Sequence, residues 1–576
     1  MRTTLWRSFI RWLPVYRTFP DYSKTNFRSD ALAGVTVGIL LVPQGMAYAV
    51  LAGMPPVYGL FSATVPLIVY AFSGASRQLS VGPAAIVSLL IASGVSQWAT
   101  PGSAQYISLV IQLSLLAGMV QLLAGGVRLG YLANFLSRPV IHGFSSAAAL
   151  VIMGSQVGNL LGIPIPRLSH LHEVILALLQ TDSPIHWPTV AIGGGAMGII
   201  LVAKRIHRSI PGPLIAIVAG TLMVFGFGLS PAGVKIVGNI PSGAPPLSVP
   251  ALSIATLRML WPQALIIGFV GFLESFAVAK AMATKHPGQL IGANREFLAL
   301  GAANVAGAFF SAYPVAGGFG RTAVNERAGA VTQMASLISA LVVLLSLLFL
   351  TPLFFHLPSA VLAAMIVLAV IPLVAVGEMR HLWQTDKRDF VMLLASFFGT
   401  LTLGVEMGIG VAVVLSLLLV VYNASNPHCA VLGKLPGSRH YMNIERFPEA
   451  TTCDDILVFR FDGPLFFGNA GVFEDRLHTL VKARGDVLRL VVLDASAIHS
   501  MDSTSVHTLE GMLDTFDAMK IHFYTAYVRG PIRDVMKRGG LYERIGTSNH
   551  FMTVADAVDW FIHNRRKEES KCLSNN

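Results

Sequence analysis

An arginine flanked by helix-breaking residues stands in one of the most hydrophobic parts of the chain. Residues 311–327 read SAYPVAGGFGRTAVNER, with Arg321 near the centre. Backbone that leaves a helix at membrane depth is tolerated only where it is buried in protein or lines a cavity. We expect Pro314 and the glycines at 317–318 to break the chain and a half-helix to restart over 322–325. Its free N–H groups and Arg321 would suit an anion; the alternative is a re-entrant loop that only packs.

A second stretch of the same character lies in the first half of the chain. Residues 77–90 read RQLSVGPAAIVSLL. Pro83 suits the first turn of a helix, where its missing N–H does no harm. We therefore expect an extended segment at 78–81, followed by a second half-helix that runs to about residue 88.

A few polar side chains interrupt the apolar sequence beside these two broken segments. They are Gln44, Tyr48, Ser88 and Thr322. Gln44 belongs to a Pro-Gln-Gly sequence at 43–45 that predicts a break in the first apolar segment. These side chains are candidate lining for an aqueous cavity. Serine and threonine are also common packing residues in membrane helices, so each residue alone indicates little.

One carboxylate, Glu274, lies deep within a strongly apolar segment that reads GFVGFLESFAVAK. Acidic residues in such segments are costly and usually face a cavity or a partner. A carboxylate that is costly to charge is suited to taking up and releasing a proton, which makes Glu274 a candidate for proton coupling. The alternative is a structural role, paired with Lys280 or Arg321.

Patterns typical of enzymes, metal sites and cofactors are not found in the sequence. His170 and His172 lie in a stretch that we expect to be an external loop, without accompanying acids at metal-ligand spacing. The sequence GKLPGS at 433–438 lacks the lysine placement of a phosphate-binding loop. We expect no enzyme activity, no metal and no cofactor.

A second polar motif, Asp502–Ser503–Thr504, follows a predicted strand and opens a predicted helix. The simpler interpretation is that the aspartate caps the helix. The alternative is that Ser503 is a phosphorylation site.

The elements that must position these residues are membrane helices, because 54% of the 576 residues are hydrophobic and only 12% are charged. The apolar part runs from about residue 31 to 424. Residues 1–30 form a basic arm without the apolar core of a signal peptide. The formal charge of +11 is explained by basic residues on the cytoplasmic side of membrane segments, without nucleic acid. All three cysteines lie after the apolar part, so no disulfide framework is expected.

The apolar part divides into two halves of seven segments each, at about 31–229 and 256–424. In each half the first segment carries a polar residue, Gln44 or Glu274, and the third is interrupted. Matching interruptions in two halves indicate a binding site at a repeat interface. Lysine and arginine concentrate in alternate loops, so we expect fourteen segments with the N- and C-termini both cytoplasmic.

The rest of the chain has the composition of a soluble domain. We expect a polar linker at 425–450, a small α/β domain at 451–568 with alternating strands and helices, and a polar tail at 569–576.

Five long motifs resemble the sulfate permease (SulP) family of anion transporters with a C-terminal STAS domain. They are AGVTVGILLVPQGMAYAVLAGMPPVYGLFSA (33–63), SVGPAAIVSLL (80–90), NREFLALGAANVAGAFFSAYPVAGGFGRTAVNERAG (294–329), VLGKLPGSRHY (431–441) and, for the STAS domain, VLDASAIHSMDSTSV (492–506). The resemblance covers nearly the whole chain. It implies a polytopic α-helical membrane protein with a 7+7 inverted repeat, divided into core and gate domains, a cytoplasmic α/β STAS domain and a homodimer.

The resemblance also implies an anion site between the facing starts of segments three and ten. Carried over, its residues are Gln44, Tyr48, Val81, Gly82, Pro83, Ala84, Gly318, Phe319, Gly320, Arg321 and Thr322, with Glu274 beside them. Glutamate at 274 is similar to the proton-coupled members, whereas sodium-coupled bicarbonate members carry aspartate there. The family's frequent GSFSRTAVN reads GGFGRTAVN here, so two hydroxyls are missing at 318 and 320 and selectivity does not carry over.

The main hypothesis is a secondary active transporter of a small anion such as sulfate, bicarbonate or a dicarboxylate, coupled to protons and working by an elevator-like movement. The alternatives are a passive anion channel or uncoupled exchanger and, more remotely, a membrane anchor for a signalling STAS domain. Ser503 matches the position phosphorylated in related regulators, and the STAS domain is expected to bind a regulatory protein or a nucleotide. From the compact length we expect a bacterial inner membrane protein.

Overall fold

The computed structural model describes residues 22–134, 137–165, 171–181, 183–206, 211–286, 289 and 291–574. Most of the expected basic arm, together with His170, lies outside the described residues. The chain forms two units, residues 1–416 and 417–576, and each is described by itself.

The first half of the membrane unit follows the expected order of segments. Its helices are α3 (Lys24–Leu51), α4 (Pro56–Ser62), α5 (Val65–Ser73), α6 (Ala85–Val95), α7 (Ala104–Gly126), α8 (Arg138–Leu161), α9 (Leu171–Gln180), α10 (Trp187–Ile206) and α11 (Gly212–Gly226), with a 3₁₀ turn at Leu129–Asn134 and the short strand β1 (Val81–Gly82) before α6. Helix α9 lies in a stretch that we expected to be an external loop.

The second half repeats this order. It contains α12 (Ile254–Ala283), α13 (Ala293–Ala308), the short strand β2 (Ala316–Gly317), α14 (Phe319–Arg327), α15 (Met334–Leu345) with a π and a 3₁₀ extension to Phe354, α16 (Ser359–Val370) with a 3₁₀ turn at Ile371–Leu373, α17 (Val376–Thr385), α18 (Lys387–Leu403) and α19 (Val405–Ser425). Helix α17 was not expected from the sequence.

Fourteen segments account for this order when α4–α5 count as one and α9 and α17 are left aside. Among the described residues, eight helices are long and apolar enough to cross a membrane. The other six segments are α6, α11, α13, α14, α18 and α19, of which α6 and α14 are the interrupted ones.

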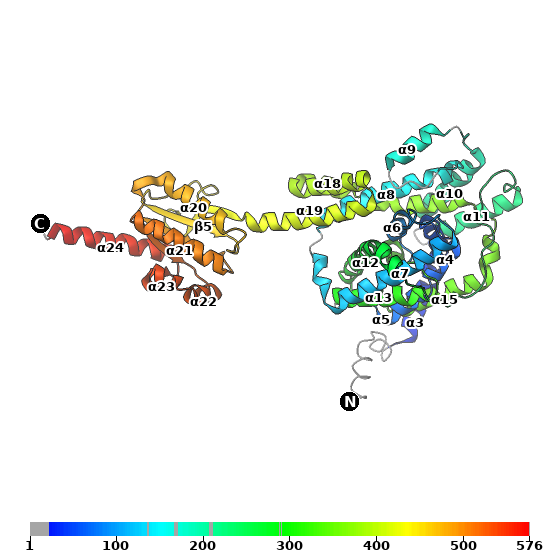
Figure 1. Cartoon of the computed structure of the whole chain (residues 1–576), viewed down its shortest axis with the longest axis horizontal. Coiled ribbons are helices and arrows are strands. Elements are labelled where there is room, and N and C mark those ends of the chain that lie inside the picture. Colours follow the sequence, from blue (N-terminus) through cyan, green and yellow to red (C-terminus); the bar gives the residue numbers. More distant parts are fainter. Residues whose placement is uncertain are drawn as a thin grey trace, which may run out of the picture. The chain divides into compact units, whose positions relative to one another are not determined.

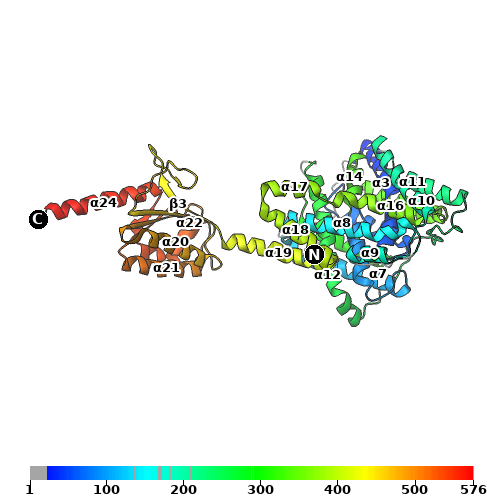
Figure 2. The same ribbon diagram turned by 90° about the horizontal axis from the view of Figure 1, so that it is seen from above.

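The packing of the helices shows the relation between the halves. Helix α3 packs on α15 and on α14, and its counterpart α12 packs on α7 and on α6. In the same way α8 contacts α18, and its counterpart α16 contacts α10. Each of these helices therefore makes the same contacts with the other half as its counterpart does in the opposite direction. A 7+7 repeat requires this correspondence. By their contacts, one group contains α3–α7 and α12–α15, and the other contains α8, α10, α11 and α16–α18. Figures 1 and 2 label these helices in two views.

Local signals start several of these helices. Ser103 caps α7 by accepting a hydrogen bond from the backbone N–H of Tyr106, and Ser253 and Thr256 form a capping box at the start of α12. Helix α8 ends at Gly162, whose φ of 72° lies in the left-handed region.

The expected break at Pro43 does not occur, because α3 continues through it from Lys24 to Leu51. The helix is closely packed on both sides of the proline. A Cβ on Gly38 would lie 2.7 Å from Val342, and one on Gly45 would lie 3.0 Å from Gly59 O. Packing against α15 and α4 therefore overrides the local tendency of proline to break a helix.

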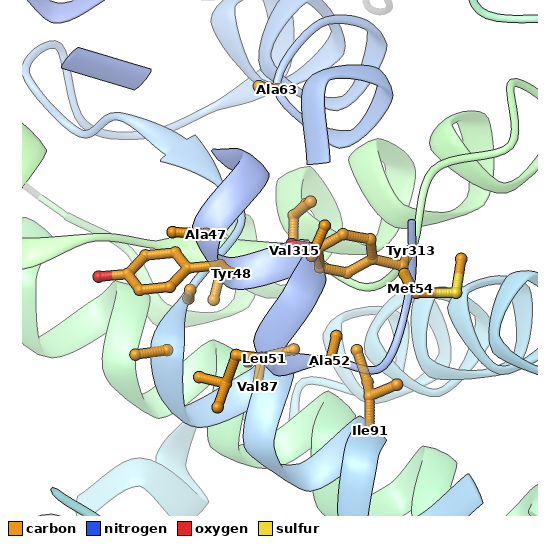
Figure 3. Close-up of a cluster of buried hydrophobic side chains, with 14 of the residues drawn as sticks. Ala47, Tyr48, Leu51, Ala52, Met54, Ala63, Val87, Ile91, Tyr313 and Val315 are labelled. Atoms are coloured by element: carbon orange, nitrogen blue, oxygen red, sulfur yellow. The ribbon is translucent and has the colours of Figure 1, made fainter. Parts of the chain in front are cut away.

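The C-terminal end of α3 contributes to a cluster of buried apolar side chains. Ala47, Leu51 and Ala52 pack with Val87 and Ile91 of α6 and with the residues that precede β2 (Figure 3). This apolar packing fixes α3 against both interrupted segments.

The second unit is an α/β domain built on one six-stranded sheet. Its strands are β3 (His428–Lys434), β4 (Tyr441–Asn443), β5 (Ile456–Asp462), β6 (Leu490–Asp494), β7 (His522–Ala526) and β8 (His550–Phe551), in the order β4-β3-β5-β6-β7-β8. Strands β5 to β8 are parallel, whereas β3 is antiparallel to β4 and β5. The expected linker at 425–450 was therefore wrong: it supplies two strands of the sheet, because Cys429 pairs with Phe461 and Val431 with Phe459.

Helices cover both faces of this sheet (Figure 2). They are α20 (Ala470–Arg484), α21 (Ser503–Ala518), α22 (Gly530–Arg538), α23 (Leu541–Ile545) and α24 (Val554–Ser574). Phe473 and Phe516 belong to the cluster that packs on one face, whereas Phe561 of α24 belongs to the cluster on the other. Helix α24 continues into the residues that we expected to be a polar tail.

Candidate functional site

The starts of the two interrupted segments meet as a short antiparallel ladder. Val81 pairs with Gly317, and Gly82 pairs with Ala316. The backbone N–H of Gly318 donates to Ser80 O at 3.1 Å. Each strand leads directly into its half-helix, so the starts of α6 and α14 are held beside each other.

Side chains of α14 strengthen this link. The hydroxyl of Thr322 accepts a hydrogen bond from the backbone N–H of Ser80 at 3.1 Å, and Asn325 Nδ2 donates to Gln78 O at 2.9 Å. Helix α14 begins at Phe319, three residues before the restart that we expected at Thr322. The expected half-helix is therefore present but one turn longer at its start.

Arg321 is the charged group at this junction, and its side chain is almost completely buried, with 3% exposed. Its Nη1 donates to Pro83 O at 2.6 Å and approaches Gln44 Oε1 at 3.5 Å. Its Nε and Nη2 have no hydrogen-bond partner among the described residues. One end of the guanidinium is thus anchored on the first interrupted segment, while two N–H donors are left for another group.

Gln44 and Tyr48 of α3 extend this arrangement. Gln44 Nε2 donates to the hydroxyl oxygen of Tyr48 at 3.0 Å, while Gln44 Oε1 faces Arg321. Both ends of the amide are used, so Gln44 orients its neighbours. Because the Tyr48 oxygen accepts from Gln44, its own O–H is free to donate elsewhere. The hydroxyl of Tyr48 points away from the apolar side chains around it (Figure 3).

Glu274 projects from α12, which also packs against β2 and α14. Its Oε2 has no hydrogen-bond partner among the described residues, and Arg321 interacts with it electrostatically. Lys280 lies instead over the ring of Phe276, 5.9 Å from its centroid. The alternative pairing of Glu274 with Lys280 is therefore not present, and the interaction with Arg321 is through space.

The remaining expected site residues divide by exposure. Val81, Gly82, Pro83 and Ala84 are buried in β1 and the turn into α6. Phe319 is 56% exposed, and Gly320 beside it is exposed as well. Ser88 is buried in α6, and its Oγ has no hydrogen-bond partner in the described part of the chain.

Two buried polar residues that position β2 were missed from the sequence. The hydroxyl of Ser275, next to Glu274, accepts from the N–H of Gly317 at 2.7 Å. Asn304 of α13 brackets Val315: its Oδ1 accepts from the Val315 N–H at 2.8 Å and its Nδ2 donates to the Val315 carbonyl at 3.3 Å. The Asn304 side chain thus satisfies the backbone N–H and C=O of Val315, which a neighbouring strand would otherwise do. The only sign of this role in the sequence is that Asn304 is a polar residue within an apolar segment.

Two other carboxylates in the described part of the membrane unit are fully buried, whereas Glu274 is partly exposed. Glu296, in the first turn of α13, is 0% exposed, and its Oε1 accepts from the hydroxyl of Tyr70 at 2.8 Å. Asp30 of α3 is also buried and accepts from the backbone N–H groups of Val331 and Thr332 at 2.8 and 3.0 Å. These two carboxylates connect neighbouring segments, unlike Glu274.

In the α/β unit the expected helix cap is confirmed. Asp502 Oδ1 accepts from the N–H of Ser505 at 2.9 Å and Oδ2 accepts from the N–H of Phe467 at 2.8 Å. Burial alone would raise the pKa of Asp502, but these hydrogen bonds and that of the Ser505 hydroxyl outweigh it and lower the pKa below its usual value of 3.8. Ser503 is exposed at the first position of α21. Within the described ranges, no group of three His, Cys, Asp or Glu residues is placed to hold a metal ion.

The arrangement combines convergent donors with one carboxylate. The free N–H groups of Arg321, the O–H of Tyr48 and the start of α14 offer positive charge and donors. Glu274 is the acidic group that acts on Arg321. Such a set of groups can hold a small anion and exchange a proton beside it.

Models of two known families match the chain. The sulfate permease family matches residues 27–396, and the STAS domain matches residues 447–557. The first match covers more than half of the chain.

Curated relatives match along nearly the whole length. The chain is 38% identical to sulfate transporter 4.1, chloroplastic, of Arabidopsis thaliana over 565 residues, which covers 95% of this chain and 81% of that protein. It is 35% identical to a probable sulfate transporter of Mycobacterium tuberculosis over 550 residues, covering 96% of this chain and 98% of that protein.

Solved structures share the fold. The structure of SLC26A9 superposes with a TM-score of 0.89 at 23% identity, covering 99% of this chain and 95% of that one. The transmembrane domain of the cyanobacterial bicarbonate transporter BicA superposes with a TM-score of 0.59 at 21% identity, covering 69% and 98%.

Proposed function

Because the chain belongs to the sulfate permease family and carries a STAS domain, we propose that it is a secondary active transporter of a small anion, with sulfate as the first candidate. Several relatives are named sulfate transporters, which supports this choice. The observation that carries the proposal is the pair of unpartnered N–H donors of the buried Arg321 at the meeting point of α6 and α14.

The proposed anion lies in front of the start of α14 and is held by Arg321. Tyr48 supplies a further donor, and Gln44 keeps Arg321 and Tyr48 in their orientation. A buried cation with unpaired donors is costly without a ligand. A bound anion would satisfy both the charge and the hydrogen bonds.

Glu274 is the proposed proton-coupling group. Its unpartnered oxygen and its electrostatic interaction with Arg321 support this role. An anion on Arg321 weakens the attraction between Arg321 and Glu274, which favours proton uptake by the carboxylate. Binding of the anion and of the proton would then favour each other, as symport requires.

Transport is proposed to occur by movement of the group α3–α7 and α12–α15 against the group α8, α10, α11 and α16–α18, in an elevator-like cycle. The proposal further includes a homodimer in a bacterial inner membrane, with both termini cytoplasmic. The STAS domain is proposed to bind a regulatory protein or a nucleotide, with Ser503 as a phosphorylation site.

The test is uptake of labelled sulfate into proteoliposomes that contain the full chain, with an inward proton gradient and no membrane potential. One pH unit is worth about 1.4 kcal/mol per proton, which is enough for about tenfold accumulation per coupled proton. We expect accumulation that collapses when a protonophore is added. Equilibration without accumulation would instead identify a passive channel or an uncoupled exchanger.

Replacement of Glu274 by glutamine should abolish accumulation while leaving downhill exchange of sulfate measurable. Glu296→Gln is the control, because Glu296 is a buried carboxylate of the same unit that is hydrogen-bonded to Tyr70. It should keep the dependence on the proton gradient. A Glu274→Gln protein that accumulates sulfate as the wild type does would exclude this residue as the coupling group.

A further inference from the structure

Tyr313 lies in the segment that leads into β2 and is completely buried, with 0% exposed. Its ring belongs to the apolar cluster that also contains Leu51, Val87 and Ile91 (Figure 3). Its hydroxyl, in contrast, has no hydrogen-bond partner among the described residues. Buried hydroxyls in native proteins nearly always have a partner, because a buried hydroxyl without one lowers stability. The hydroxyl of Tyr313 is therefore an unexplained polar group inside the membrane unit.

Side chains from three helices hold the backbone on which Tyr313 stands. The N–H of Tyr313 donates to Ser62 Oγ of α4 at 2.9 Å. The next two alternate N–H groups along the segment donate to Asn304 Oδ1 of α13 at 2.8 Å and to Ser275 Oγ of α12 at 2.7 Å. All three acceptor residues are themselves buried. The segment therefore fixes where the ring of Tyr313 lies, and the ring has little freedom to seek another partner.

The surroundings of this hydroxyl belong to the proposed anion site. Arg321 and Tyr48 both interact with Tyr313 electrostatically. Ser88 of α6 also lies close enough to interact with Tyr313, but its Oγ likewise completes no hydrogen bond within the described residues. Besides the unpartnered N–H groups of Arg321, the junction of α6 and α14 thus has two buried hydroxyls without a partner.

A single ligand that accepts hydrogen bonds would satisfy these groups together. We propose that Tyr313 is a further anion-binding residue, whose hydroxyl donates to the anion held by Arg321 and Tyr48. Because Tyr48 belongs to the first half of the chain and Tyr313 to the second, each half then contributes one tyrosine to the site. This inference rests on the proposed function, because it adds a contact to the same site.

The test replaces Tyr313 by phenylalanine in the full-length protein, purified in detergent. Tyr106→Phe is the matched control, because Tyr106 is equally buried, with 0% exposed, but its hydroxyl donates to Ala52 O at 2.6 Å. Two quantities are measured for each variant without any gradient. They are the unfolding temperature of the protein without sulfate and the affinity for sulfate, determined by calorimetry.

Tyr313→Phe removes an O–H that has no partner in the empty protein, so its unfolding temperature without sulfate should stay the same or rise. Its affinity for sulfate should fall about tenfold, the loss of one hydrogen bond to a charged ligand. Tyr106→Phe should do the opposite: it should lower the unfolding temperature and leave the affinity unchanged. In a Ser88→Ala background Tyr313→Phe should still weaken sulfate binding, since the anion and not Ser88 is the partner.

An unchanged affinity in Tyr313→Phe would overturn the inference. A lower unfolding temperature of the sulfate-free variant would also overturn it, because the hydroxyl would then have a structural partner such as Ser88 or a buried water. A wild-type protein that binds no sulfate would overturn both this inference and sulfate as the substrate. A protein that binds as expected but does not accumulate sulfate would refute symport and leave the role of Tyr313 intact, whereas gradient-driven accumulation with unchanged binding in Tyr313→Phe would do the reverse.

Discussion

Replacing Asn304 by alanine should loosen the extended segment that leads into α14. The change removes three hydrogen bonds: two to the backbone of Val315, at 2.8 and 3.3 Å, and one from Nδ2 to Gln121 Oε1 at 2.9 Å. Side-chain hydrogen bonds inside membrane proteins contribute about 0.6 kcal/mol each on average and about 1.7 kcal/mol at most. The expected loss in the free energy of unfolding is therefore about 2 kcal/mol, with an upper bound of about 5 kcal/mol.

The same change should also weaken the anion site, because Val315 directly precedes β2 and the start of α14. In the variant, anion binding would have to order this segment again, and the free energy spent on ordering is lost from binding. Each 1.4 kcal/mol or so spent in this way lowers the affinity about tenfold. The assay is thermal unfolding in detergent together with calorimetric binding of sulfate. Gln121→Met is the control: it removes the bond to Asn304 and a second bond from Gln121 Nε2 to Gly268 O at 2.9 Å. It keeps both bonds between Asn304 and Val315 and should therefore lower sulfate affinity less.

An Asn304→Ala protein with unchanged unfolding temperature and unchanged sulfate affinity would refute this reasoning. Equal losses of sulfate affinity in Asn304→Ala and Gln121→Met would also refute it, because the hydrogen bonds to Val315 would then contribute nothing specific to the anion site. A loss of stability without a loss of affinity would show that Asn304 supports packing alone.

Two further predictions concern the STAS domain. Burial lowers the pKa of His550 below its usual value of 6.5. The buried, neutral ring therefore contributes fully to the stability of the domain above the usual value. This contribution is lost as the pH falls through the lowered pKa. Limited proteolysis of the full chain should show faster cleavage of the domain near pH 5 than at pH 7.5, and a His550→Gln variant should lose this difference. Asp502→Ala should destabilise α21 by about 1 kcal/mol, whereas Asp502→Asn keeps the cap and should change urea unfolding little; equal losses would contradict the capping role.

The interrupted segments could be predicted because their signals are local. Pro83 and the glycines at 317–318 interrupt strongly apolar sequence, and the structure has a strand and a half-helix at each place. The restart of α14 was predicted at Thr322 and occurs at Phe319, since helix ends depend on hydrogen bonds that residue types fix only within a few positions. Arg321 and Glu274 were selected as candidate site residues because charged residues are rare in apolar segments.

Features that depend on distant partners could not be predicted. The continuation of α3 through Pro43 depends on packing against α15 and α4, and the hydrogen bonds of Ser275 and Asn304 to the β2 segment connect residues far apart in the sequence. A single sequence shows that such a residue is polar, but it does not show its partner. Strands β3 and β4 were missed for a related reason: they lie toward one edge of the sheet, where polar and turn-forming residues are common.

The contacts around the site limit how it can move during transport. Strands β1 and β2 pair directly, Ser80 bonds to Thr322, and Arg321 bonds to Pro83 across the junction. Separating α6 from α14 would break these bonds among buried groups, which is costly. In the proposed cycle, access must therefore alternate by movement of the joined pair together, with α3 and α12 attached, against the second helix group. In this cycle the anion stays bound to the same donors, while the side of the membrane from which the site is accessible changes.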